Sequence, residues 1–268
     1  MTLALPEHPI ERLLAIMAAL RHPEQGCPWD RKQTFETIVP HTLEEAYEVA
    51  DTIERGDWAE LPGELGDLLF QVVFYARIAE ERGQFDFLAV VAQLNDKLVH
   101  RHPHVFAGLE VDEATIKANW ESGKAQERAD KAQHSALDNV PLNLPALSRS
   151  VKLQKRASRV GFDWDSLEPV VAKVAEEIDE VMAETRQAVV EPARVEEEMG
   201  DLLFAVTNLA RHLKVDPEQA LRRANAKFER RFRQVEGCCA EAGVEPQEAG
   251  LDQLEAFWQS IKAREKQE

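Results

Sequence analysis

The sequence predicts an all-α protein built from two tandem copies of one domain, with about four helices in each copy. Apolar residues recur at three- and four-residue spacing, whereas almost no segment alternates with a period of two. A set of landmark residues occurs twice in the same order, as expected of an internal repeat. Glycine and proline residues separate the periodic segments and so mark helix ends. Together these observations predict helical bundles.

The first apolar segment runs from Leu13 to Leu20. Glu7, Glu11 and Arg12 precede it, so it lacks the basic leader and the small-residue cleavage site of a signal peptide. No segment approaches the ~18–20 apolar residues that a membrane span needs. We therefore expect an amphipathic helix here and a soluble, cytoplasmic protein with no membrane partner.

The segment HTLEEAYEVADTI, around Glu44, is expected to form the next helix. Its apolar residues fall on one stripe, which we assign to the core of the domain: Leu43, Ala46, Tyr47, Ala50 and Ile53. Glu45 and Glu48 project from the opposite face, a position that by itself favours a solvated surface.

A further helix is expected beyond Gly56, Pro62 and Gly63. From Leu68 to Ala79 it is apolar on nearly every face. Such a helix is usually buried all round, in a core or between subunits. A small domain would cover it by dimerising, so we expect a homodimer.

The second copy repeats the order of the first. The segment KVAEEIDEVMAET, around Glu176, matches HTLEEAYEVADTI, and EMGDLLFAVTNLA, from Glu198, matches ELGDLLFQVVFYA, from Glu64. The flanking residues also agree: Trp29-Asp30 with Trp164-Asp165, Asn95-x-Lys97 with Asn225-x-Lys227, and WESGK at Trp120 with WQSIK at Trp258. Chance similarity between acidic helices would not preserve this order.

The domain bounds follow from the repeat. We expect an N-terminal domain over residues 1–125, a linker over 126–148 and a C-terminal domain over 149–268. The linker begins with charged residues and ends with Pro141 and Pro145, which interrupt helices.

Each copy carries four carboxylates in two pairs at three-residue spacing, which places the members of a pair on one helix face. The pairs are Glu45 with Glu48 and Glu64 with Asp67, then Glu177 with Glu180 and Glu198 with Asp201. Hard cations such as Mg²⁺ take oxygen ligands of this kind. A solvated acidic surface is the plain alternative. The second pair of each copy, however, begins an otherwise apolar helix, and the whole arrangement occurs twice, so the sequence favours a metal site.

The overall charge limits the partners. Lys plus Arg number 32 and Asp plus Glu number 49, giving a formal net charge of −17. Such a surface repels a phosphate backbone, which argues against nucleic acid as a partner. A triphosphate site would need a metal ion and local basic residues. The three cysteines, Cys27, Cys238 and Cys239, have no zinc-motif spacing and are expected to be reduced thiols.

These residues resemble the MazG family of nucleoside triphosphate pyrophosphohydrolases. The EExxE and ExxD signature, the GD-LLF segment and the terminal W-x-S-x-K carry the resemblance, which spans essentially the whole chain. The resemblance implies an all-α dimer whose subunits contribute helices to each other. It also implies Mg²⁺, with Mn²⁺ as an alternative ion, bound by the signature carboxylates. The implied reaction converts a ribo- or deoxyribonucleoside triphosphate, ATP included, and water to the monophosphate and pyrophosphate.

The two copies differ in their basic residues. Lys173 and Arg194 stand one turn before Glu177 and Glu198, whereas His41 and Glu60 occupy these places in the first copy. The resemblance implies nucleotide contacts from Lys173, Glu176, Glu177, Arg194, Glu197, Lys227, Arg230, Arg231 and Trp258, with Lys262 one turn beyond. We expect the C-terminal copy to be the main catalytic centre, with Glu177 as general base and Lys173 as a catalytic cation.

Several alternatives stay open. Residues Lys227 to Arg231 could be an ordinary solvated basic face, and Trp258 could belong to a core instead of stacking on a base. The protein could be a narrow all-α pyrophosphohydrolase for dUTP or phosphoribosyl-ATP. It could also be a non-catalytic helical module, either a metal buffer or an adaptor. A buffer would not need Lys173, Arg194 and Lys227 near its carboxylates.

Overall fold

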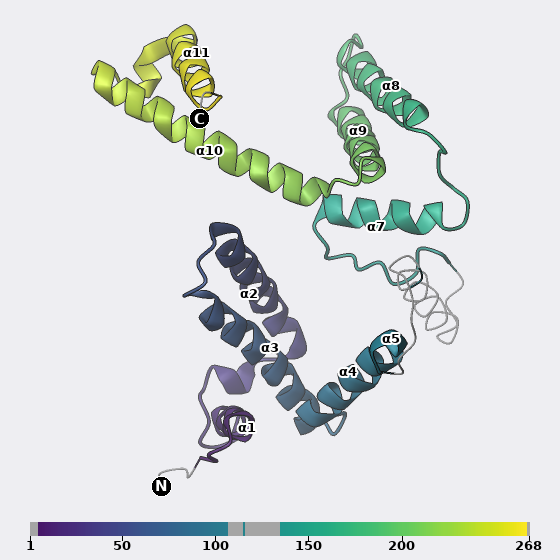
Figure 1. Ribbon diagram of the computed structural model, residues 1–268, viewed down its shortest axis with the longest axis vertical. Helices are drawn as coiled ribbons and strands as arrows, with labels where there is room; N and C mark the ends of the chain where they lie inside the picture. The colour runs from purple at the N-terminus through teal and green to yellow at the C-terminus, as the bar shows by residue number, and fades with distance from the viewer. Residues whose placement is uncertain (1–4, 107–114, 116–134, 267–268) are drawn as a thin grey trace. The chain divides into compact units, whose positions relative to one another are not determined.

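The computed structural model describes residues 5–106, 115 and 135–266 (Figure 1). These residues form ten α-helices and one short 3-10 helix and contain no strand, which confirms the all-α prediction. The chain divides into two compact units, Met1–Arg128 (unit 1) and Ala129–Glu268 (unit 2). Trp120 and residues 126–134 of the expected linker lie outside the described residues. The domain bounds derived from the repeat stay a prediction.

Unit 1 begins with α1 and the 3-10 helix η1 and continues through a hairpin of two long helices. Its elements are α1 (Pro9–Leu20), η1 (Asp30–Lys32), α2 (Phe35–Arg55), α3 (Leu61–Glu81), α4 (Phe87–Arg101) and α5 (Pro103–Phe106). Thr34 starts α2 through a reciprocal cap with Thr37. Gly56 ends it with φ 69°, a left-handed conformation that glycine adopts without a Cβ penalty. The turn that follows brings α3 back along α2.

The core of unit 1 lies where α1 and α2 meet α3. Its buried members are Met17, Ile38, Val73, Phe74 and Ile78. Arg21, at the end of α1, ties the loop before α2 to the end of α3. Its guanidinium donates to both carboxylate oxygens of Glu81 and to the carbonyl oxygens of Asp30 and Gln33. These hydrogen bonds hold in place the loop that leads into α2.

Unit 2 repeats the helical hairpin and adds a longer one. Its elements are α7 (Ala146–Ser158), α8 (Leu167–Thr185), α9 (Pro192–His212), α10 (Pro217–Ala242) and α11 (Pro246–Arg264). Helices α7 and α8 both pack on α9. Helices α10 and α11 form a hairpin with its own small core of Val235, Cys239 and Ile261. Unit 2 therefore has two sub-structures, which Figure 1 shows as the α8–α9 pair and the long α10 with α11.

The apolar stripe that we assigned to the core of unit 1 is exposed in the single chain. Leu43 is 43% exposed, Tyr47 44% and Ile53 47%. The opposite face of α2 contacts α3 instead, since Gln71 Nε2 donates to Glu45 and Thr42 shares a hydrogen bond with Tyr75. The assignment was wrong because helical periodicity reveals two faces without showing which of them the neighbouring helix covers.

The α3 segment, which was expected to be buried all round in a core or between subunits, is buried only in part in the single chain. Its residues Val73, Phe74, Ala76, Ile78 and Ala79 are buried, but Leu69 and Val72 are each 39% exposed. The single chain therefore leaves part of the apolar surface of α3 in contact with solvent. None of the helices in the described residues is both long enough and apolar enough to cross a bilayer.

Candidate functional site

The predicted carboxylates of unit 2 converge between α8 and α9. Glu177, Glu180 and Glu198 each place a carboxylate oxygen within 4.8 Å of the other two. Glu177 is only 5% exposed, although an ionised carboxylate is rarely buried without a partner. Asp201 lies one turn beyond Glu198 and, with Glu177, lines a cavity described below. Three of the four predicted carboxylates of unit 2 thus meet between the two helices, and Asp201 is not part of this group.

Two cations stand beside these carboxylates. Lys173 Nζ lies 2.7 Å from Glu177 Oε1 and 2.9 Å from Glu176 Oε1. Hydrogen bonds to Glu177 and then Glu176 raise the pKa of Lys173, so it stays protonated. The one-turn spacing noted in the sequence therefore supplies a charge partner for the buried Glu177.

The second cation is Arg194, at the start of α9. Its guanidinium lies 2.6 Å from Glu197 and 3.2 Å from Glu198, measured between nitrogen and oxygen. A third, longer contact of 3.7 Å joins it to Glu184 on α8. The negative charge of Glu197 contributes most to a raised Arg194 pKa. Arg194 thus links the two helices at the edge of the acidic cluster.

The cluster still has more negative charge than its cations balance. The pKa of Glu180 is raised above its ordinary value, first by a hydrogen bond with Glu177 and then by desolvation and the charge of Glu177. Three converging carboxylates with oxygen donors suit a hard divalent cation, which would relieve this repulsion. The residues present therefore fit a metal of the Mg²⁺ type.

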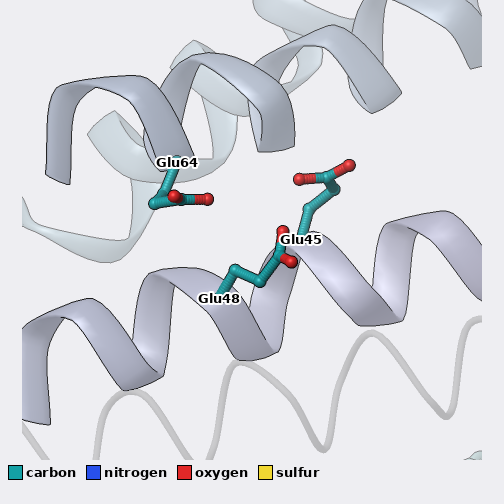
Figure 2. Close-up of side chains that lie close together, drawn as sticks. All are labelled: Glu45, Glu48 and Glu64. Atoms are coloured by element: carbon teal, nitrogen blue, oxygen red, sulfur yellow. The ribbon is translucent and has the colours of Figure 1, made fainter. Parts of the chain in front are cut away.

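Unit 1 contains the matching cluster. Glu45 and Glu48 on α2 and Glu64 on α3 offer carboxylate oxygens within 4.8 Å of one another, and Figure 2 shows the three side chains meeting between the helices. The pKa of Glu45 is raised by desolvation and then by the charges of Glu48 and Asp67. Desolvation and the charge of Glu48 also raise the pKa of Glu64. This cluster therefore meets the same geometric requirement.

The cations around the two clusters differ. Among the described residues of unit 1, no Lys or Arg forms an ion pair with Glu45, Glu48 or Glu64. His41 lies 3.6 Å from Glu44, and Arg55 pairs with Glu60 at 2.8 Å. His41 and Arg55 therefore contact carboxylates outside the cluster, and Arg55 acts on Glu64 through its charge alone.

The remaining predicted site residues lie together on the α10–α11 hairpin. They are Lys227, Arg230 and Arg231 on α10 and Trp258 and Lys262 on α11. Arg230 and Arg231 both pair with Glu265, and the Arg231 guanidinium lies 5.7 Å from the centroid of the Trp258 ring. Trp258 also packs against the small core of the hairpin. Within the described residues, no interaction joins these side chains to the acidic cluster of α8 and α9.

A cavity of about 520 Å³ opens beside the acidic cluster of unit 2, between α7, α8 and α9. Lys173, Glu177 and Asp201 form one part of its wall, and apolar and aromatic residues form much of the rest. The sequence had not identified it. Two signals were available: Trp164 is part of a repeated landmark, and Asn208 lies within a largely apolar segment.

The comparison with protein families finds two matches to one domain. Residues 33–106 and 165–236 each match the MazG nucleotide pyrophosphohydrolase domain, and together they span more than half of the chain. The two segments contain the two acidic clusters. The predicted repeat and the predicted family resemblance are thereby confirmed.

Proteins similar over most of this chain carry related names. The nucleoside triphosphate pyrophosphohydrolase of Escherichia coli (strain K12) is 60% identical over 257 residues, which cover 96% of this chain and 98% of that protein. The nucleoside triphosphate pyrophosphohydrolase/pyrophosphatase MazG of Thermotoga maritima is 43% identical over 252 residues, 94% of this chain and 95% of that protein. A nucleoside triphosphate pyrophosphohydrolase of Mycolicibacterium smegmatis is 37% identical over 193 residues, 70% of this chain and 60% of that protein.

Proposed function

The chain belongs to the MazG family of nucleotide pyrophosphohydrolases, and from that premise we propose that it hydrolyses nucleoside triphosphates to the monophosphate and pyrophosphate. The observation that carries the proposal is the buried Glu177 in unit 2. It lies in a carboxylate cluster that fits Mg²⁺ and pairs with a lysine that could exchange this partner for a phosphate. The names of the Escherichia coli and Thermotoga maritima relatives agree with this activity.

The residues that would hold the metal are Glu177, Glu180, Glu198 and Asp201, with Mn²⁺ as an alternative ion. When bound, Mg²⁺ supplies neutralisation of phosphate charge and lowers the pKa of a nearby water. We assign to Glu177 the role of general base, which would orient the attacking water and accept its proton. One P–O bond forms to the water oxygen, the bridge between the α- and β-phosphates breaks, and pyrophosphate leaves.

In this proposal Lys173 and Arg194 bind the phosphates of the substrate. Both now pair with carboxylates, and both are long enough to exchange one of these partners for a phosphate oxygen. Charge-assisted bonds of this kind are roughly twice as strong as neutral ones. Glu176 and Glu197 hold the two cations in place from the solvent side, where each accepts a second bond.

A homodimer fits the exposed apolar faces. The stripe of α2, with Leu43, Tyr47 and Ile53, meets water in the single chain, and so do Leu203 and Phe204 of α9. Apolar patches of this extent on a soluble surface mark interaction sites. In a dimer whose subunits share helices, the basic face of a second α10–α11 hairpin could approach the cluster, bringing residues equivalent to Lys227, Arg230, Arg231, Trp258 and Lys262. Free cysteines and triphosphate substrates fit a cytoplasmic location.

The decisive experiment measures pyrophosphate release from eight ribo- and deoxyribonucleoside triphosphates, in Mg²⁺ and in EDTA. Release from most of them in Mg²⁺ alone supports the broad hydrolase. Release from dUTP alone would point to the narrow enzyme, and phosphoribosyl-ATP is added to the panel for the same reason. No release from any substrate would leave the non-catalytic metal-binding adaptor.

A further inference from the structure

Gln71 is a buried polar side chain of α3 that lies beside the acidic cluster of unit 1. It is only 5% exposed, and its Oε1 is buried and has no hydrogen-bond partner among the described residues. A buried acceptor of this kind costs free energy, because it has given up its hydrogen bonds to water. In a folded protein such a group calls for an explanation, and a bound ion or water at the site is one.

The other end of the Gln71 amide faces the cluster. Gln71 Nε2 donates to Glu45 Oε1 at 3.4 Å, which is longer than the ~2.9–3.0 Å of a typical N–H···O bond. An ionised carboxylate only accepts hydrogen bonds, so the NH₂ group must be the end of the amide that faces Glu45. A member of the cluster thereby determines the direction of the Gln71 oxygen.

Gln71 continues a row of oxygen-bearing side chains on α3. Glu64, Asp67 and Gln71 follow one another at intervals of three and four residues, which places them on one face of the helix. Phe74, one turn further along, is fully buried in the core. Gln71 therefore stands where the acidic cluster meets the core, and it adds a neutral oxygen to the two carboxylates of α3.

Unit 2 has no equivalent amide at this place. The matching segments ELGDLLFQVVFYA and EMGDLLFAVTNLA align Gln71 with Ala205 and Phe74 with Asn208. Ala205 has no polar side-chain atom, and both Ala205 and Asn208 line the cavity of unit 2. The two units therefore differ in polarity at the position next to their carboxylates.

Equivalent carboxylates of the two clusters also have different donors. The repeat aligns Glu45 with Glu177, which pairs with Lys173 at 2.7 Å. In unit 1 His41 takes the place of Lys173, and Glu45 receives a hydrogen bond from Gln71 on the neighbouring helix instead. A lysine neutralises the carboxylate that it contacts, whereas an amide orients the carboxylate and leaves its charge available to a cation.

We propose that Gln71 is a positioning residue of a divalent-cation site formed by Glu45, Glu48 and Glu64 (Figure 2). Its NH₂ group orients Glu45, and its Oε1 accepts a hydrogen bond from a water molecule in the hydration shell of the cation, since Mg²⁺ usually keeps several waters. This inference rests on the proposed metal binding and not on hydrolysis. It makes unit 1 a cation site that needs no nucleotide.

The test isolates the unit 1 cluster in the full chain. Glu180→Ala with Asp201→Ala removes two carboxylates of unit 2, and Mn²⁺ binding without nucleotide is measured by electron paramagnetic resonance of the free ion. Binding should remain in this background, and adding Glu48→Ala with Asp67→Ala should abolish it. Adding Gln71→Met instead should raise the Kd for Mn²⁺ about 10–100-fold, the range for partners that orient metal ligands.

Two further variants separate positioning from packing. Methionine fills nearly the same space as glutamine, so Gln71→Met should not lower Tm in EDTA, where no cation needs the amide. Gln71→Ala gives unit 1 the residue of unit 2 and should also raise the Kd. Val73→Ala, at a buried core position of the same helix, is the matched control. It should lower Tm in EDTA and keep the Kd within about twofold.

Three results would overturn the proposal. The Kd could stay at the background value in both Gln71 variants, it could rise equally in Val73→Ala, or Mn²⁺ could fail to bind the background at all. Pyrophosphate release by the otherwise unchanged chain is independent of these outcomes, and Gln71→Met should keep its kcat within about twofold. Hydrolysis without Mn²⁺ binding in the background would remove only this inference. Mn²⁺ binding that depends on Gln71, without any pyrophosphate release, would remove the hydrolase function and retain the cation site.

Discussion

The acidic clusters of units 1 and 2 have the same carboxylates in the same geometry, with three oxygens within 4.8 Å in each. Their surroundings differ in two respects. In unit 2 a lysine and an arginine contact the cluster, whereas in unit 1 no described cation does so. Beside the cluster, unit 2 has a cavity and unit 1 has the buried Phe74. The two units therefore share the carboxylates that are proposed to bind metal, and they differ in the groups that surround these carboxylates.

The largest expected effect comes from removing the carboxylates of one unit at a time. Glu180→Ala with Asp201→Ala should lower kcat on the order of 10³-fold, because metal stabilisation of the transition state is worth several kcal/mol. The matched pair Glu48→Ala with Asp67→Ala should leave kcat within about twofold, if unit 1 is not a main catalytic centre. Steady-state pyrophosphate release measures both. The reverse result would show that unit 1 is the main catalytic centre.

The cations provide the next test. Lys173→His gives unit 2 the residue that unit 1 has at this position, and kcat/KM should fall roughly 10–100-fold, since a charge-assisted bond contributes about 1.5–3 kcal/mol. The reciprocal His41→Lys should not change kcat/KM measurably. A similar loss from both variants would show that the two clusters act together, contrary to the comparison drawn here.

Metal binding should be shared by the two units. Mg²⁺ at ten times its Kd stabilises a folded site by about 1.4 kcal/mol, which raises Tm by roughly 5 °C for a unit of this size. A thermal scan in Mg²⁺ and in EDTA measures the shift. The double variant Glu48→Ala with Asp67→Ala should remove the part of the Tm shift that comes from metal binding to unit 1. An equal Tm in Mg²⁺ and EDTA for the wild type would contradict metal binding at either cluster.

The smallest effect concerns one ion pair in each unit, Arg21 with Glu81 in unit 1 and Arg211 with Asp163 in unit 2. Arg21 lowers the pKa of Glu81 in unit 1, and hydrogen bonds from Arg211 and then His212 lower the pKa of Asp163 in unit 2. A carboxylate with a lowered folded pKa stabilises the protein above its unfolded pKa of about 4 and loses this contribution as pH falls through the folded value. Glu81→Gln and Asp163→Asn should each cost about 0.5–1 kcal/mol at pH 7, and progressively less as pH falls from about 4 through the lowered folded pKa. Urea unfolding over a series of pH values measures this decline, and a cost that stays constant as pH falls would assign the effect to packing.

Much of the fold could be predicted from the sequence because it depends on local spacing. Helical periodicity gave the all-α class, and the three-residue spacing of Glu45 with Glu48, and of Glu177 with Glu180, placed each pair on one face. In the sequence Lys173 stands one turn before Glu177, and in the structure the two side chains form an ion pair. These features need only the geometry of a single helix.

Features that depend on neighbouring elements could not be predicted in this way. The stripe containing Leu43 and Tyr47 was assigned to the core, but which face of α2 meets α3 depends on packing between helices. The cavity was not predicted because it forms only where α7, α8 and α9 pack together, and spacing within one helix does not reveal such packing. The position of Trp258 away from the acidic cluster also follows from tertiary contacts of the α10–α11 hairpin.

The buried Phe74 has a consequence for how the two halves of the molecule respond to their surroundings. An aromatic ring that fills its own space contributes stability whatever the solution contains, whereas an open cavity forgoes that packing until a ligand enters. Unit 1 would then keep a constant melting temperature as nucleotide levels change. Unit 2 would gain resistance to unfolding and proteolysis that rises with the logarithm of the ligand concentration above its Kd. The duplicated domain would then pair a half whose packing is complete without ligand with a half that is stabilised when a ligand fills its cavity.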